Sequence, residues 1–96
     1  MLEIVQRPRA REDLKGIWRY SFRQWGEAQA DKYLAEIEAG IGQLKHNPKL
    51  GRPRDNLRPG YRALRVNQHI VYYVLTPSLI RVVRVLHARM DPDRYL

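Results

Sequence analysis

Residues 61–87, YRALRVNQHIVYYVLTPSLIRVVRVLH, decide the fold of this chain. Apolar side chains alternate there with a period of two, and Val, Ile and Tyr are residues favoured in β-strands. The pattern predicts three strands, at Tyr61–Val66, His69–Leu75 and Leu79–His87. They are separated by Asn67-Gln68 and by Thr76-Pro77-Ser78, and connections this short produce an antiparallel meander.

Upstream of the meander the hydrophobic period changes to that of an α-helix. The large apolar residues that recur every three or four positions are Leu14, Trp18, Phe22 and Trp25. This stripe predicts an amphipathic helix that opens at Pro8, carries Glu12 and Asp13 in its first turn, and ends at Gly26. We expect Trp18 and Trp25 to pack in the core rather than to form a platform for stacked bases.

A second helix is predicted to start at Glu27 and to stop at Asn47-Pro48. Its apolar stripe consists of Ala30, Leu34, Ile37, Ile41 and Leu44. The connection between the two helices is so short that they must form an antiparallel hairpin. Gly40 and Gly42 weaken the second helix, and we expect them to allow close approach to a neighbouring backbone.

Residues 2–6 read as a short strand, which completes a β-α-α-β-β-β order. This order predicts an α+β fold in which an antiparallel sheet packs against an N-terminal helical hairpin. Residues 1–96 are few enough to be organised around one core, so we expect a single domain.

Positive charge is concentrated in the second half of the chain. Residues 1–38 hold seven acidic and seven basic side chains, whereas residues 39–90 hold ten Lys or Arg and one acid, Asp55. The formal net charge of the whole chain is +8. A domain with one cationic part offers a face to an anionic partner, either nucleic acid or an acidic peptide.

Several classes of protein are disfavoured by composition. The chain has no cysteine, so it has no disulfide and no thiolate chemistry. The first residues contain no apolar signal region, and no apolar run approaches the ~20 residues that cross a bilayer, so a cytoplasmic location without membrane contact is expected. The three histidines are scattered without carboxylates at ligand spacing, so we expect no metal and no cofactor.

The faces of the meander strands limit the chemistry that they can share. In a regular last strand Ile80, Val82, Arg84 and Leu86 point one way, and Arg81, Val83, Val85 and His87 point the other. Both faces of the middle strand are apolar, and the helices can cover only one of them. The second face is therefore either an exposed interface or is covered by a terminal segment of the chain.

The chain resembles the ParE branch of the ParE/RelE toxin superfamily, the toxin halves of bacterial toxin–antitoxin modules. The resemblance rests on four stretches, IWRYSFRQWGEAQADKYLAEI (17–37), NPKLGRPRDNLRPGYRAL (47–64), HIVYYVL (69–75) and IRVVRVLHARMDP (80–92). It implies the RelE/ParE-like fold, a ParD-like antitoxin as partner, and poisoning of DNA gyrase with arrest of replication and growth. In the family, operator DNA is bound mainly by the antitoxin, so direct DNA binding by this chain alone is not expected.

An antitoxin partner also fits the residues themselves. A cationic half with a leftover apolar sheet face suits an amphipathic acidic peptide that folds as it binds. The residues expected to face the antitoxin, chosen because they should be exposed, are Arg62, Arg65, Tyr72 and Tyr73.

The RelE branch of the superfamily suggests an alternative function, ribosome-dependent cleavage of mRNA. That reaction needs a base, an acid and a cation near the phosphate. The candidates here are Arg65, Arg84, His87 and Tyr95. Arg84 and His87 should face opposite ways, and all four lysines lie outside the predicted sheet, so a binding inhibitor without catalytic residues is favoured over an enzyme.

The surface expected to contact the target combines the C-terminal segment with the arginines of the loop between the hairpin and the meander. Its residues are Arg52, Arg54, Arg58, Arg84, His87, Arg89, Met90 and Tyr95.

Overall fold

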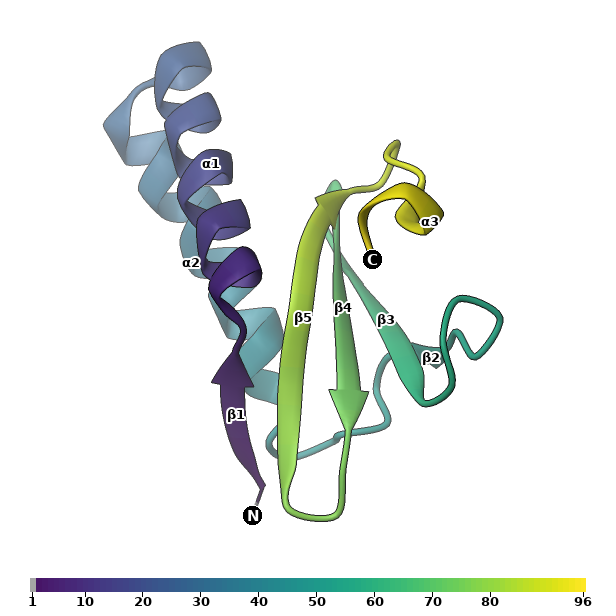
Figure 1. Cartoon of the computed structure of the whole chain (residues 1–96). Coiled ribbons are helices and arrows are strands. Elements are labelled where there is room, and N and C mark those ends of the chain that lie inside the picture. The colour runs from purple at the N-terminus through teal and green to yellow at the C-terminus, as the bar shows by residue number, and fades with distance from the viewer. Residues whose placement is uncertain (1) are drawn as a thin grey trace.

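The computed structural model describes residues 2–96 (Figure 1). The elements in chain order are β1 (Glu3–Gln6), α1 (Pro8–Trp25), α2 (Glu27–Gln43), β2 (Arg52–Pro53), β3 (Tyr61–Val66), β4 (His69–Leu75), β5 (Leu79–His87) and α3 (Pro92–Tyr95). The predicted order of strand, helical hairpin and three-stranded meander is confirmed. Two short elements, β2 and α3, are additional to it.

The five strands form one sheet in the order β1-β5-β4-β3-β2. The pairs β3–β4 and β4–β5 are antiparallel, as the short connections predict. The first strand, β1, lies parallel to β5, so the sheet is mixed rather than wholly antiparallel. The helical hairpin carries the chain from β1 across one face of the sheet. The meander β3-β4-β5 then returns toward β1, so its last strand, β5, is the one that lies beside β1.

The helices cover one sheet face with a continuous apolar core. Ile37 and Ile41 of α2 and Leu14 of α1 pack against Val82 and Val85 of β5. The turn between the helices is made at Gly26, whose φ of 89° lies in the region that favours glycine and whose N–H donates to the Phe22 carbonyl at 2.8 Å. This tight turn gives the antiparallel hairpin that the sequence predicts.

The expectation that Trp18 and Trp25 lie in the core is wrong. Trp25 is 65% exposed and Phe22 is 46% exposed, and Trp18 is half-buried on the surface of the hairpin. The indole N–H of Trp18 donates to Asp31 of α2 at 2.8 Å. The far end of the hairpin projects beyond the end of the sheet (Figure 1), so the sheet does not cover these aromatic side chains.

The second sheet face is covered by the end of the chain. Met90, Leu96 and Leu57 pack over a buried cluster of Ala63, Tyr72 and Leu86. The short helix α3 lies on the opposite side of the sheet from the hairpin (Figure 1). Over this cluster the second sheet face is covered by the terminal segment, as one of the two alternatives expected, together with Leu57 of the loop before β3.

A register shift in β5 changes which side chains share a face. Tyr73 pairs with Val82 while its neighbour Tyr72 pairs with Arg84, so one extra residue is inserted in β5. Val82 and Val85 consequently both face the helices, which a regular strand would not allow. The expected grouping of Val82 with Arg84 is wrong for this reason.

The two glycines near the end of α2 differ in their surroundings. A Cβ added to Gly40 would lie 2.6 Å from Cγ2 of Val66 in β3, which is far inside van der Waals contact. A Cβ added to Gly42 would meet no atom within 4 Å. Close approach is thus a property of Gly40, toward a neighbouring side chain, and is not shared by Gly42.

This difference predicts stability changes of opposite sign. Gly40→Ala should lower the free energy of unfolding by about 1–2 kcal/mol, because the β-branched Val66 has little freedom to move aside. Gly42→Ala should raise it by about 0.5–1 kcal/mol through better helix propensity. Urea unfolding followed by circular dichroism would measure both, and a stabilised Gly40→Ala variant would contradict the close packing of α2 on β3.

Candidate functional site

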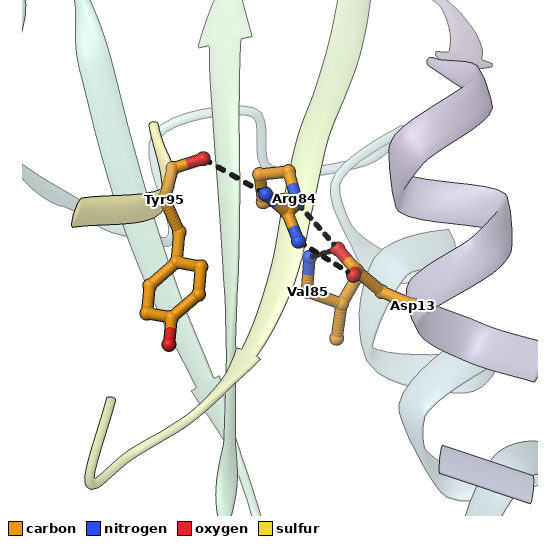
Figure 2. Close-up of polar contacts among 4 residues, drawn as sticks. All are labelled: Asp13, Arg84, Val85 and Tyr95. Carbon is orange, nitrogen blue, oxygen red and sulfur yellow. Dashed lines mark hydrogen bonds and ion pairs between the residues drawn. The ribbon is translucent and has the colours of Figure 1, made fainter. Parts of the chain in front are cut away.

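The free edge of β5 is closed by a side chain from α1. Strand β1 pairs with β5 only as far as Val82, so the β5 backbone beyond Val82 has no strand neighbour on that side. There the carboxylate of Asp13 accepts the backbone N–H of Val85 at 2.9 Å. The same carboxylate accepts two bonds from Arg84, from Nε at 2.8 Å and from Nη2 at 2.9 Å (Figure 2).

The prediction that Asp13 lies in the first turn of α1 is wrong, because that turn contains no acidic residue. Asp13 instead pairs with Arg84 of β5. Both side chains are largely buried, with 13% of Arg84 and 15% of Asp13 exposed. The bonds to Asp13 raise the pKa of Arg84 above its ordinary value, against the opposing effect of burial. Arg84 therefore holds α1 to the strand as a permanent cation.

Arg84 also connects the C-terminal segment to this junction. Its Nη1 donates to the Tyr95 carbonyl at 2.8 Å, and its guanidinium carbon lies 5.9 Å from the centre of the Tyr95 ring (Figure 2). Arg58 donates to the Leu96 carbonyl nearby at 3.4 Å. The guanidinium of Arg84 is thus fully engaged inside the chain, and little of it is available to a target.

An open groove lies beside this junction, between the hairpin and the end of the sheet. It has a volume of about 910 Å³. The residues of its upper wall are Glu12, Asp13, Gly16, Ile17, Tyr20, Ser21 and Trp25 of α1 with Gln29 and Tyr33 of α2. Its lower wall includes His69, Val85, His87 and Met90. Tyr20 and Trp25 are 61% and 65% exposed, so the groove presents apolar surface to solvent.

A hydrogen-bonded pair, Tyr33 and His69, lies in the groove with the ring of His87 packed beside it. The hydroxyl of Tyr33 accepts the backbone N–H of Gln68 at 3.1 Å and is hydrogen-bonded to Nδ1 of His69 at 2.7 Å. The rings of His69 and His87 are 5.2 Å apart. Burial, with a smaller contribution from His87, lowers the pKa of His69 from 6.5 to about 4, so His69 is neutral at pH 7.

The residues expected to face the antitoxin divide into two groups. Tyr72 and Tyr73 are buried, with 2% and 0% exposed, so their expected exposure is wrong. Tyr72 lies beneath the C-terminal segment, and the Tyr73 hydroxyl donates to the Pro48 carbonyl at 2.7 Å under the loop. Arg62 is tied to the Gly51 carbonyl, whereas Arg65 is exposed and donates to Gln68 beside the groove.

The loop arginines expected to contact the target are largely at the surface. Arg52 in β2 and Arg58 are exposed, and Arg54 is half-buried with a bond to Asn56 at 3.3 Å. In the C-terminal segment Arg89 is exposed, while Met90 is half-buried against Tyr72. His87 lies in the groove together with Met90, and its Nδ1 accepts the backbone N–H of Arg89 at 3.1 Å.

The four ribonuclease candidates are not brought together. Arg84 pairs across the sheet with Tyr72 on the face beneath α3, and Tyr95 lies against it. His87 pairs with His69 on the helix face, and Arg65 is bound to the carbonyl of Asn67 in the β3–β4 turn. Their separate surroundings argue against a shared reaction centre.

The sequence reasoning missed Tyr33, His69 and the groove itself. The sequence did contain one signal for the groove: α1 has more large aromatic side chains than a single core-facing stripe can bury. Among residues 2–96 no three His, Asp or Glu side chains are grouped so as to hold a metal ion. Within the same range no helix has the length and apolar character needed to cross a membrane.

The junction predicts a large cost for removing one partner. Asp13→Asn should lower the free energy of unfolding by about 2–3 kcal/mol, because Arg84 would keep a buried charge without its counter-ion. The adjacent Glu12→Gln change provides a matched control, since Glu12 is 65% exposed and its one ion pair within residues 2–96 is with Lys15. Urea unfolding should show the control within about 0.5 kcal/mol of wild type. Equal effects of the two changes would contradict the assigned role of Asp13.

The Tyr33–His69 pair predicts a pH dependence with a defined sign. The folded state resists protonation of His69 down to pH about 4, whereas an unfolded histidine protonates near 6.5. The unfolded state therefore binds more protons between these values, and stability should fall as pH decreases from 6.5 to 4. NMR titration should place the His69 midpoint near 4, well below 6.5, and His69→Gln should flatten the stability profile. A His69 midpoint near 6.5 would refute the burial effect.

Comparison with known proteins places the chain in a family. The model of the ParE toxin of type II toxin–antitoxin systems matches residues 4–92. A toxin ParE1 from Mycobacterium tuberculosis is 44% identical over 90 residues, which span 93% of this chain and 92% of that protein. A toxin ParE1 from Caulobacter vibrioides is 39% identical over 88 residues, spanning 92% and 91% of the two chains.

Solved structures agree on the fold. The chromosomal ParDE system of P. aeruginosa aligns with a TM-score of 0.80 at 20% identity, covering 91% of this chain and 96% of that one. The YoeB dimer of Staphylococcus aureus aligns with a TM-score of 0.65 at 23% identity, covering 90% and 95%. With the family model matched from β1 to the start of α3, the chain belongs to the ParE toxin family of type II toxin–antitoxin systems.

Proposed function

We propose that this toxin arrests growth by inhibiting DNA gyrase, and that a ParD-like antitoxin neutralises it by occupying the groove. The observation that carries the proposal is the family match over residues 4–92, which spans both walls of the groove and the loop arginines. The solved relatives include the ParDE system of P. aeruginosa and the DinJ–YafQ complex of E. coli, in which toxins of this fold are paired with partners.

The groove has the chemistry that an amphipathic antitoxin segment needs. Tyr20 and Trp25 provide exposed aromatic anchors, and Arg65 donates to Gln68 at its lower rim. Aromatic anchors supply most of the affinity of such contacts, while opposite charge speeds encounter. The excess of basic residues at positions 39–90 supports an acidic partner.

The target surface that we propose consists of Arg52, Arg58 and Arg89 together with the exposed ring of Tyr95. It omits Arg84, because that guanidinium is bound to Asp13 and Tyr95. The toxin acts on gyrase by binding one state of its cycle more tightly than the others, which shifts the population toward that state. The separation of Arg65, Arg84 and His87 supports this inhibitor role over mRNA cleavage.

The proposal predicts the outcome of a plasmid supercoiling assay. Purified toxin should abolish supercoiling by gyrase and leave trapped, cleaved DNA, and excess antitoxin should restore activity. Replacing Arg52, Arg58 and Arg89 together with Glu should remove the inhibition. The matched control replaces Arg7, Arg9 and Arg11, which are also exposed, and so changes the net charge equally at another place.

Inhibition that survives the first triple change, or that is lost equally in the control, would reject the proposed surface. Unaffected gyrase in the presence of folded toxin would reject the proposed target. Cleavage of ribosome-bound mRNA by the same preparation would then support the alternative ribonuclease function.

A further inference from the structure

Two rows of side chains on the α3 side of the sheet follow from the strand pairing, because residues directly opposite one another in paired strands project to the same face. The first row is buried beneath the C-terminal segment at Ala63 and Tyr72. In Figure 1, α3 lies close to the end of β5, away from the β4–β5 turn. The second row lies closer to that turn and consists of Arg54, Tyr61, Val74 and Arg81.

Arginine lies at both ends of the second row. Arg54 directly follows β2, the edge strand, and donates its backbone N–H to the Tyr61 carbonyl at 2.7 Å, whereas Arg81 belongs to β5. Arg52 lies on the same face at the β2 edge, because it pairs with Ala63. Neighbouring strands are about 4.8 Å apart, so the strand order places the two groups of arginine roughly 14 Å from each other.

The positive charge at these two edges is not neutralised inside the chain. Arg52 and Arg81 are exposed, and neither forms an ion pair within residues 2–96. Asp55, the one acid among residues 39–90, accepts the backbone N–H of Gly60 at 2.8 Å. Glu3 of β1 lies on the same face and forms no ion pair in the described range either. Planar guanidinium groups without partners are suited to phosphate.

We propose that this face binds the phosphate backbone of duplex DNA, with Arg52 and Arg54 against one strand and Arg81 against the other. The major groove is about 12 Å wide, which is close to the separation of the two arginine groups. The inference rests on the proposed function and deepens it, because it makes the DNA held by gyrase a direct partner of the toxin. Phosphate contacts carry no sequence information, so this binding differs from recognition of an operator.

A duplex polyanion fits this face better than an acidic peptide does. Protein partners obtain most of their affinity from aromatic or apolar anchors near the centre of the interface. The centre of the second row, Tyr61 and Val74, is half-buried, and the charge lies at its two ends. Within residues 2–96 the exposed large apolar side chains lie outside this row, at Tyr20, Phe22, Trp25, Leu50 and Tyr95.

The salt dependence of binding tests the proposal. The probe is a fluorescently labelled duplex of about 20 base pairs and arbitrary sequence, and its affinity for the purified toxin is measured by anisotropy from about 50 to 200 mM salt. Arg52→Gln combined with Arg81→Gln should reduce the slope of log affinity against log salt by about 1.8, because each phosphate contact contributes about 0.9. Affinity at low salt should fall about tenfold. The melting temperature should not change, since both side chains are exposed.

Arg9→Gln combined with Arg11→Gln is the matched control, because both arginines are exposed on α1 and the net charge changes equally. The control should keep the wild-type slope. Glu3→Gln should strengthen binding about twofold, since it removes a negative charge from the proposed face.

The outcomes separate this surface from the proposed function. Equal slope changes in the two double variants, or a toxin that inhibits gyrase without binding the duplex, would overturn the DNA surface and leave gyrase inhibition intact. Equal affinity for polyglutamate would assign the face to an acidic peptide and would also overturn it. A toxin that binds the duplex through Arg52 and Arg81 but leaves gyrase unaffected would reject gyrase inhibition alone.

Discussion

The structure depends on how the open edge of β5 is closed. Strand β1 covers that edge only to Val82, and an unpaired strand edge inside a fold leaves backbone groups without partners. Asp13 replaces the missing strand by accepting the Val85 N–H, and Arg84 balances its charge. Because Arg84 also binds the Tyr95 carbonyl, one ion pair fixes α1, β5 and the C-terminal segment relative to one another. The placement of α1 and of the C-terminal segment on either side of β5 follows from this junction.

The groove is a consequence of the same geometry. The α1 helix is anchored to the β5 edge at Asp13, so the half of the helix that follows extends past the sheet (Figure 1). The side of α1 that packs on the core at Leu14 continues into residues that have no sheet beneath them, including Tyr20. An amphipathic helix longer than its support leaves apolar surface in solvent, and such surface marks a contact site. The fold thus builds an open apolar groove without a dedicated loop.

Hydrophobic periodicity was enough to predict the hairpin and the meander, because burial of one face determines where apolar residues must recur. It could not predict the bulge in β5, since Val82, Val83 and Val85 fit either face and no turn residue marks the insertion. Nor could it predict the Asp13–Arg84 pair, whose partners are 71 residues apart in the chain. The prediction that Tyr72 is exposed was wrong because Met90, Leu96 and Leu57, which are distant from it in the sequence, cover its side chain. Local patterns specify elements, whereas contacts between the ends of the chain specify the site.

The groove and the C-terminal surface are physically connected, which bears on how a partner would silence the toxin. Met90 lines the groove and also packs against Tyr72, next to Arg89 on the proposed target surface. A partner that contacts Met90 would therefore lie against that surface and cover part of it. Binding there would also stabilise the fold by mass action, by about 2.7 kcal/mol when free partner exceeds its dissociation constant a hundredfold. The exposed aromatic residues Tyr20 and Trp25 are unfavourable in the free chain, and a partner in the groove would remove them from solvent. On the proposed function, neutralisation and stabilisation of the toxin would then be two effects of one contact.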